Sequence, residues 1–458
     1  MRSPSLALFC LCVAPLAAQT ATYAVFSTPS LAVQPPDRDR ALMAHDELRG
    51  RTLLAGGIAN ASARQDTWEW NGTIWQQVTP TTQLNFNLAV RLVWAAQRGQ
   101  ILAILGDNSV GGSQMQLYGW TGANWVLVTG NGPPSFGEGF NAAWDGQRGV
   151  LVVHSLQGTW EWDGATWQQL TTGGPTPRIN PLMAYDEARQ RVVLYGGEAV
   201  INGRRTDTWE WNGIYWLERF SIARPDLYAA HATMAYDRAR QRVVLHGGAS
   251  VSGNNNGAVF EFDGTSWSQR TTRNGPTDLF GPSMAYHSAS NRMVLYGGIS
   301  QANYQRTRTL QFVTGYIATS AAHQPGCIGP GGVPTLAAVS GSRPVLGTTY
   351  QVRFSSLPNT PASLVFAALG GSDQTWNGTP LPLDLTPIGY TSCMLRIEPA
   401  TIELLSNNSG LANWSIAVPN VPALDGAVFF MQGLVLTPGF NPGGAVTTSS
   451  LRSVAGVL

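Results

Sequence analysis

The chain has 458 residues, which is enough for two or three domains with a sizeable hydrophobic core. Only 12% of the residues are charged and the formal net charge is +1, so no acidic or basic field favours nucleic acid or a membrane surface as a partner. The 51 glycines and 16 tryptophans suit an all-β exported protein better than a helical cytoplasmic one.

The first 18 residues resemble a secretory signal peptide. Residues 1–18 contain an early arginine, an apolar centre and small residues before Gln19, so cleavage is expected near residue 18. A lipoprotein signal using Cys10 or Cys12 is an alternative, but it would truncate the apolar centre. No later apolar run is long enough to span a bilayer. We therefore expect a secreted or extracytoplasmic protein of the cell envelope or the extracellular space that does not span the membrane.

Residues 180–216 contain one complete antiparallel repeat unit. Its four strands are predicted at 183–186, 192–195, 207–211 and 215–219. Gly196 and Gly197 release the chain into a loop after the second strand, and Asn212-Gly213 supplies the positive φ angles of a two-residue hairpin. A unit of this kind cannot bury both of its faces alone, so its recurrence decides the fold.

The unit recurs six times along the chain. The first strand of each copy carries an aromatic or histidine anchor at an equivalent position: His45, Trp94, Trp144, Tyr185, Tyr236 and Tyr286. The anchors are 41 to 51 residues apart, which fits four-stranded propeller blades and not leucine-rich or helical repeats. The third strand returns as Trp-Glu-Trp at 68–70 and 160–162, and as Phe-Glu-Phe at 260–262. We interpret these aromatics as core residues that pack between blades.

This pattern resembles the kelch family of galactose oxidase-like β-propellers, which carry a double glycine after the second strand and spaced aromatics in the third and fourth. The resemblance covers residues 22–318 and implies a six-bladed kelch-type β-propeller at 19–320. Most kelch propellers are binding scaffolds and a few secreted members are enzymes. A strand at 23–33 is expected to complete the sixth blade and close the ring, with 316–322 as the alternative fourth strand.

Long loops on one face of the ring give the main functional clue. The second-to-third loops, such as 58–65 and 198–206, lie on the same side as the connections between blades, and that face is the predicted binding site. Its candidate ligand-binding residues are Arg64, Asn108, Arg204, Arg205, Tyr228, His231, Asn254, Tyr304 and Arg306. Guanidinium and amide groups beside aromatic rings suit sugar hydroxyls, carboxylates or a polar protein surface.

Two enzymatic interpretations find little support in the residues. The turns at 163–167 and 263–267 look like the Asp-box of sialidases but lack one residue of that motif, and no sialidase arginine triad is recognisable. Copper chemistry of the galactose oxidase type needs a cysteine in the propeller, and none is present. We therefore predict no catalytic residues, no metal ligands and no cofactor.

A second domain follows a Pro- and Gly-rich linker at 321–334. Recurrent short strands and turn clusters in residues 335–458 predict an antiparallel β-sandwich. Cys327 and Cys393 are the only cysteines after the signal and are expected to form a disulfide, worth on the order of 4 kcal/mol in the chain-entropy model. The domain looks similar to a C-terminal domain on secreted proteins of environmental bacteria such as planctomycetes. Attachment, export or sorting, and glycan binding are left open as its role.

We therefore predict a secreted, non-enzymatic binding protein that recognises a glycan or an extracellular or envelope protein through the long-loop face. The first alternative is a carbohydrate-active enzyme of the sialidase, lyase or sugar epimerase type that uses the same face. The second is an architectural component of the envelope or matrix.

Overall fold

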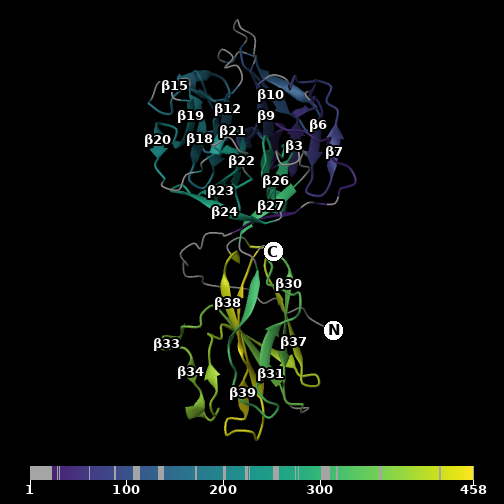
Figure 1. The fold of residues 1–458 in the computed structure, drawn as a ribbon, viewed down its shortest axis with the longest axis vertical. Coiled ribbons are helices and arrows are strands. Elements are labelled where there is room, and N and C mark those ends of the chain that lie inside the picture. Colours follow the sequence, from purple (N-terminus) through teal and green to yellow (C-terminus); the bar gives the residue numbers. More distant parts are fainter. Residues whose placement is uncertain are drawn as a thin grey trace. The chain divides into compact units, whose positions relative to one another are not determined.

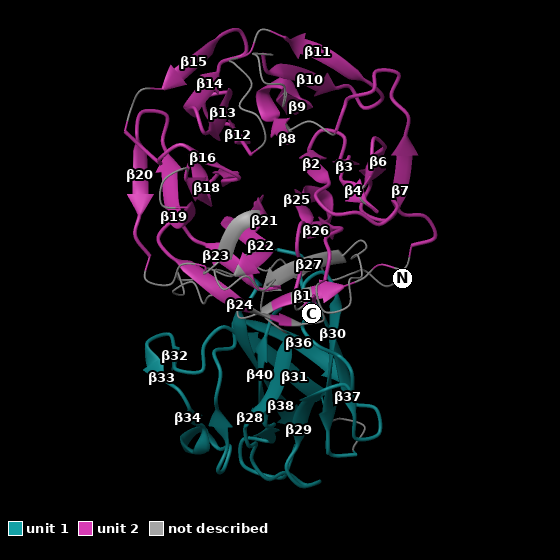
Figure 2. Ribbon diagram, turned by 45° about the horizontal axis from the view of Figure 1, so that its top comes forward, with its two compact units in different colours: residues 1–23, 314–458 teal, residues 24–313 magenta. Residues whose placement is uncertain are grey.

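The computed structural model divides into two compact units (Figures 1 and 2). One unit is Ala24–Val313, and the other is Thr314–Leu458 together with Met1–Tyr23. It describes residues 23–27, 29, 31–60, 62–86, 89–106, 114–130, 132, 139–170, 173–199, 203–221, 225, 227–250, 257–273, 275–276, 278–300, 310–315, 318–359, 364–421 and 424–456. The predicted signal peptide lies outside these residues. Each unit is built from antiparallel β-sheets.

The unit Ala24–Val313 consists of six successive four-stranded arrays, which we call repeats 1 to 6. Repeat 1 contains β2 (Leu42–Asp46), β3 (Arg51–Ala55), β6 (Thr67–Trp70) and β7 (Trp75–Val78), with a small pair of β4 (Ile58–Ala59) and β5 (Ser62–Ala63) between β3 and β6. Repeat 2 contains β8 (Ala89–Ala95), β9 (Gln100–Gly106), β10 (Gln116–Trp120) and β11 (Trp125–Thr129). Repeat 3 contains β12 (Asn141–Asp145), β13 (Val150–Ser155), β14 (Gly158–Trp162) and β15 (Trp167–Leu170).

The later repeats keep the same order of strands. Repeat 4 contains β17 (Leu182–Asp186), β18 (Arg191–Ala199), β19 (Gly203–Trp211) and β20 (Trp216–Arg219), with the short strand β16 (Arg178–Ile179) paired to β18. Repeat 5 contains β21 (Leu227–Asp237), β22 (Arg242–Ser250), β23 (Val259–Phe262) and β24 (Trp267–Arg273). Repeat 6 contains β25 (Ser283–His287), β26 (Arg292–Tyr296), β27 (Leu310–Gly315) and the N-terminal β1 (Tyr23–Ser27). The 3₁₀ turns Ala96–Arg98 and Ser288–Ser290 follow β8 and β25.

The first strands of the six repeats contact one another in a cycle. β2 contacts β8, and contacts continue through β12, β17, β21 and β25 back to β2. Figure 2 shows the repeats of this unit placed around a common centre. Hydrophobic clusters fill the spaces between neighbouring repeats: Trp211, for example, packs with Val152 of repeat 3 and Leu194 of its own repeat. The tryptophans of the third strands are therefore core residues.

The N-terminal strand joins the last two repeats. β1 lies between β24 and β27, so repeats 5 and 6 form one eight-stranded sheet. Phe26 is buried, with its ring centre 5.5 Å from that of His246. A Cβ added to Gly275 would lie 2.4 Å from the ring of Phe26, so this ring leaves room only for glycine there. The alternative fourth strand is not used for this purpose, because Thr319–Gln324 forms β28 and pairs with β40 (Ser450–Val454).

Several predicted loops are shorter than expected. In repeat 4 the segment 198–206 was expected to be a loop, but β18 and β19 extend into it, with Glu198 opposite Arg204 and Gly197 opposite Arg205. In repeat 1, β4 and β5 pair within the predicted loop 58–65. Backbone pairing holds these segments because each contains facing runs of extended residues that satisfy one another's polar groups.

The unit Thr314–Leu458 contains two main sheets that share one hydrophobic core. One sheet has the order β28, β40, β38 (Val428–Leu436), β31 (Leu364–Gly370) and β36 (Thr401–Ser406), with β39 (Ala445–Thr447) paired to β38. The other has the order β29 (Thr335–Ala338), β30 (Thr349–Ser355) and β37 (Ala412–Ala417). Alternate residues such as Tyr350, Val352 and Phe354 of β30 point into the core, where they meet Val365 and Met431.

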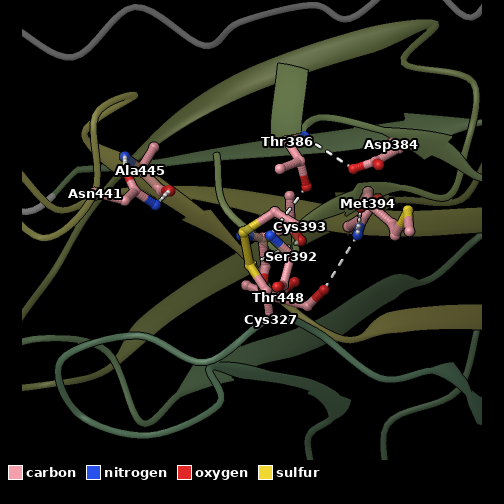
Figure 3. The surroundings of a disulfide bond; sticks show 11 residues. Cys327, Asp384, Thr386, Ser392, Cys393, Met394, Asn441, Ala445 and Thr448 are labelled. Atoms are coloured by element: carbon pink, nitrogen blue, oxygen red, sulfur yellow. Dashed lines mark hydrogen bonds between the residues drawn. A yellow bond between two sulfur atoms is a disulfide. The ribbon is translucent and has the colours of Figure 1, made fainter. Parts of the chain in front are cut away.

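A side layer of short elements carries the disulfide. It contains β32 (Thr375–Trp376), β33 (Thr379–Pro380), β34 (Leu383–Asp384), β35 (Met394–Leu395) and the 3₁₀ turn Thr386–Ile388. Cys327 and Cys393 form the predicted bond, with their Cα atoms 5.0 Å apart (Figure 3). Asp384 accepts a hydrogen bond from the backbone N–H of Thr386 at 2.8 Å beside it. Both cysteines are buried in the shared hydrophobic core and Cys393 directly precedes β35, so the bond anchors the side layer to this core.

Candidate functional site: an axial pair of cavities

The first strands of the repeats enclose two cavities. One, of about 460 Å³, lies where these strands begin, and we call it the loop-end cavity. The other, of about 410 Å³, lies where the strands end in tight turns, and we call it the turn-end cavity. Six residues at one repeat position line both cavities: Met43, Leu92, Ala142, Met183, Met234 and Met284. These mostly apolar residues therefore separate two compartments of different chemistry.

The rim of the loop-end cavity is formed by residues in the left-handed backbone region. One position, five residues before the anchor of the first strand, has positive φ in repeats 1, 3, 4, 5 and 6. Its residues are Arg40 (53°), Gly139 (100°), Asn180 (50°), His231 (68°) and Gly281 (68°). Glycine adopts this conformation without steric cost, whereas other L-residues pay about 1–2 kcal/mol. Repeats 1 and 5 place an arginine and a histidine where glycine would be relaxed, and such strained side chains concentrate at functional sites.

Backbone hydrogen bonds connect this rim from one repeat to the next. The N–H of Arg40 donates to the carbonyl of Gly281 at 2.7 Å, and the N–H of Gly281 donates to the carbonyl of His231 at 2.8 Å. The N–H of Asn180 donates to the carbonyl of Gly139. The strained positions are therefore held in place by backbone hydrogen bonds between repeats.

The next layer of the loop-end cavity is variable in polarity. It is contributed by one position of each first strand: Leu42, Arg91, Asn141, Leu182, Thr233 and Ser283. Arg91 and Arg40 are the charged side chains among the described residues that line this cavity. Arg40 contacts Asp39 at 3.3 Å, whereas Arg91 forms no ion pair with any residue that the structure describes. The cavity wall is therefore positively charged.

His231 combines strain, stacking and a depressed pKa. Its ring centre lies 3.9 Å from that of Phe280. Burial, and then the nearby charge of Arg40, lower the pKa of His231 to about 4. At neutral pH the imidazole is therefore uncharged and offers one donor and one acceptor to a ligand.

The turn-end cavity is lined by the aromatic and histidine anchors. The phenol oxygen of Tyr185 accepts a hydrogen bond from the N–H of Gln147 in the preceding repeat at 2.9 Å, and Tyr236 accepts one from Ala188 at 3.1 Å. The indole of Trp144 donates to Gln97 at 2.6 Å. These three anchors fasten repeats 3, 4 and 5 to the turn of the preceding repeat.

The cycle is completed between repeats 6 and 1 by His45. Its Nε2 lies 3.0 Å from the hydroxyl of Ser288, and its ring centre lies 4.8 Å from that of His287. Across the mouth, Arg238 of repeat 5 bonds Glu187 of repeat 4 at 2.7 Å and lies 3.6 Å from Glu47 of repeat 1. The polar groups of this end are therefore engaged in joining repeats.

A further set of ion pairs supports the tight turns. The arginine of the turn binds the glutamate of the third strand in repeats 1, 3, 4 and 5: Arg49–Glu69, Arg148–Glu161, Arg189–Glu210 and Arg240–Glu261. The next repeat adds an indole donor, as Trp120 does to Glu69 at 2.9 Å. These arginines were not among the residues predicted to have a role. The central glutamate of the Trp-Glu-Trp pattern was the signal that could have identified their partners.

The structure places the predicted ligand-binding residues unevenly. Among those described, His231 lines the loop-end cavity. Half-buried Arg64 lies next to the β4–β5 pair, while Arg204 and Arg205 lie in β19, and Tyr228 lies in β21. Asn108, Asn254, Tyr304 and Arg306 lie outside the described residues, so they stay predictions.

Sequence reasoning missed Arg40, Arg91 and Asn141. The available signal was their departure from the repeat: Arg91 and Asn141 occupy a position that is Leu in repeats 1 and 4. In the part of the chain that the structure describes, no group of three or more His, Cys, Asp or Glu residues is arranged to hold a metal ion. None of its helices is both long and apolar enough to cross a membrane.

Comparisons with known proteins identify no family. No protein-family model matches the chain, and no curated protein matches it. A solved structure that resembles it is that of YjhT, at 10% sequence identity and a TM-score of 0.45. That alignment covers 61% of this chain and 96% of the other.

Proposed function

We propose that the six repeats are the blades of a kelch-type β-propeller that binds a ligand in its loop-end cavity, and that the C-terminal unit is a β-sandwich. The chain acts in an extracytoplasmic compartment, a proposal supported by the disulfide between Cys327 and Cys393. Its ligand is a glycan or a polar segment of an envelope or extracellular protein.

One observation carries this proposal. Arg40 and His231 stand at rim positions where the equivalent residues of repeats 3 and 6 are glycines. An L-residue there costs stability. Among the described residues, Arg40 pairs with Asp39 of its own repeat and His231 forms no ion pair, so no described ion pair between repeats offsets this cost. Ligand binding accounts for this cost, because both side chains border a cavity of about 460 Å³, a volume that suits a mono- or disaccharide-sized ligand.

The test is a glycan-array screen of the mature chain, followed by calorimetry on each hit. The double variant Arg40→Gly, His231→Gly keeps the left-handed backbone, and we expect it to weaken binding at least tenfold. Gln241→Gly is the matched control, because Gln241 also has positive φ (54°) but lies in a turn away from the cavity.

Two results would contradict the proposal: unchanged affinity in the double variant, or no binding of any glycan or envelope protein by the mature chain. NMR spectra of each bound sugar, recorded over time, distinguish binding from turnover. Product formation that is lost in the double variant would favour the carbohydrate-active enzyme instead.

A further inference from the structure

Arg91 is the most conspicuous departure from the repeat in the loop-end cavity. It stands in β8 at the position that the other repeats fill with Leu42, Asn141, Leu182, Thr233 and Ser283. Each of those side chains is shorter and uncharged. Repeat 2 therefore introduces a guanidinium into a layer that needs none for packing.

The surroundings of Arg91 neutralise its charge poorly. Its Nη1 donates to the carbonyl of the preceding residue, Val90, at 2.8 Å, and its guanidinium carbon lies 5.5 Å from the ring centre of Phe140. No carboxylate among the described residues pairs with it. Burial lowers the pKa of Arg91 to about 10, because removing a charge from water is unfavourable without a counter-charge.

Two fully buried arginines of this unit, Arg38 and Arg178, differ from Arg91 because each pairs with a carboxylate. Arg38 forms a two-point ion pair with Asp66, at 2.6 and 2.7 Å, and donates to the carbonyl of Gly56. Arg178 does the same with Asp207 in repeat 4, at 2.6 and 3.0 Å. These side chains hold loops in place: Arg38 engages four of its five N–H donors and Arg178 all five. Arg91 keeps most of its five donors.

Other polar residues of the loop-end cavity also favour an anionic ligand. Arg40 supplies a second guanidinium, which is paired with Asp39 at 3.3 Å, and its charge helps to lower the pKa of His231. The amide of Asn141 donates to the carbonyl of Pro181 at 2.8 Å and marks the wall beside Arg91. An anion in this cavity would meet two guanidiniums and neutral hydrogen-bonding groups, with no described carboxylate on the lining to repel it.

We infer that the ligand carries a carboxylate or phosphate group and that Arg91 binds it. This inference rests on the proposed function, because it names the chemistry of the ligand in the same cavity. The planar fork of Arg91 matches two oxygens of either anion, and neutral hydroxyls of the ligand would face His231 and Asn141.

The experiment measures thermal stabilisation of the mature chain by three matched probes at constant ionic strength: galactose, galacturonate and galactose 6-phosphate. Galactose and galacturonate differ only in a hydroxymethyl group against a carboxylate. We expect one or both anionic sugars to raise Tm at concentrations at which galactose does not. The more effective of the two anions identifies the charged group.

Arg91→Gln should remove the difference between charged and neutral sugars, and Arg91→Lys should restore part of it through charge alone. Arg191→Gln is the matched control. Arg191 also donates through Nη1 to the preceding carbonyl at 2.8 Å, but it does not line the loop-end cavity, so this variant should respond like the unmodified chain.

The inference is overturned if galactose stabilises the chain as much as the anionic sugars do, if neither anion raises Tm, or if Arg91→Gln keeps the preference. Neutral-glycan binding that is lost in the Arg40→Gly, His231→Gly variant would then leave the proposed function standing without an anionic ligand. Failure of every glycan and envelope protein to bind would overturn both.

Discussion

The two ends of the axis are built from the same six strands, yet they use their polar groups in opposite ways. At the turn end, Tyr185, Tyr236 and Trp144 are bonded to the neighbouring repeat, and Arg238 binds two glutamates. At the loop end, backbone groups make the connections between repeats, while Arg91 keeps a guanidinium without a described carboxylate partner. The difference separates residues that hold the ring from residues available to a ligand.

This comparison shows that aromatic residues lining a cavity need not form a sugar-binding site. The rings at the turn end line a cavity and could be mistaken for a sugar-stacking site. Their hydrogen bonds to successive turns give them a structural role, whereas the loop-end cavity has fewer aromatics and more unused donors. We therefore predict that substitutions at the turn end lower the free energy of unfolding, whereas substitutions at the loop end change it little.

The largest loss is expected for Glu261→Gln. Glu261 is fully buried, bonds Arg270 at 2.7 Å and pairs with Arg240. Removing its charge leaves the buried guanidinium of Arg270 without this carboxylate and leaves Arg240 with the more distant Asp237 at 3.9 Å, which should lower the free energy of unfolding by about 3–5 kcal/mol. Urea denaturation measures the change. A loss below about 1 kcal/mol would show that the ion-pair network is not needed for stability.

Acid should weaken the seam between repeats 6 and 1. Burial, and then the charges of His287 and Arg238, lower the pKa of His45 from 6.5 to about 3. The unfolded chain therefore gains a proton below about pH 6.5 that the folded chain resists, so the stabilisation is complete above pH 6.5 and falls toward pH 3. The cost at pH 5 should be on the order of 2 kcal/mol.

Denaturation of the unmodified chain and of His45→Gln at pH 7 and pH 5 tests this point. The variant should lose less stability between the two pH values, even though it is weaker at pH 7. Glu47 lies 4.0 Å from His45 and would partly stabilise the protonated ring, which sets a limit on the difference. Equal pH dependence in both chains would assign the acid sensitivity to other groups.

A smaller effect is expected at the loop end for His231→Gly. Relief of the left-handed backbone should return about 1 kcal/mol, and loss of the contact with Phe280 should cost a similar amount. The free energy of unfolding should therefore change by less than about 1 kcal/mol while ligand binding falls. A loss of several kcal/mol would make His231 a structural residue like His45.

The smallest effect is expected for Arg91→Gln in the absence of ligand. Removing an uncompensated, half-buried charge should leave the stability unchanged or raise it by about 0.5 kcal/mol. Thermal unfolding without any sugar gives the measurement. A clear decrease would mean that Arg91 has a structural partner, and the contrast between the two ends would disappear.

The sequence was informative wherever the repeat is regular. The anchors from His45 to Tyr286 marked the first strands of the six repeats. It was less informative where side chains from distant repeats meet. The hydrogen bond that the N–H of Gln147 donates to Tyr185 depends on the register of two sheets, which the sequence alone does not give.

The loop-end cavity lies at the end of the first strands where the long loops were expected, but among the described residues its charged lining comes from Arg40 and Arg91, which the sequence analysis did not select. Loop length drew attention to Arg204 and Arg205, yet both belong to the paired strand β19. Arg91 and Arg40 lie in or just before first strands, where polar residues are easily read as solvent-facing. A comparison of each repeat position across all six copies would have distinguished Arg91 from its shorter, uncharged equivalents, and Arg40 from the glycines at its position in repeats 3 and 6.

The placement of β1 beside β27 has a consequence for biosynthesis. β1 is the first strand of its unit to leave the ribosome, and β27 is the last. The sheet that joins repeats 5 and 6 therefore stays incomplete until the entire unit has been translated, however early the central repeats could form. For the exported protein proposed above, this order would delay the final closure of the sheet until the last strand has arrived.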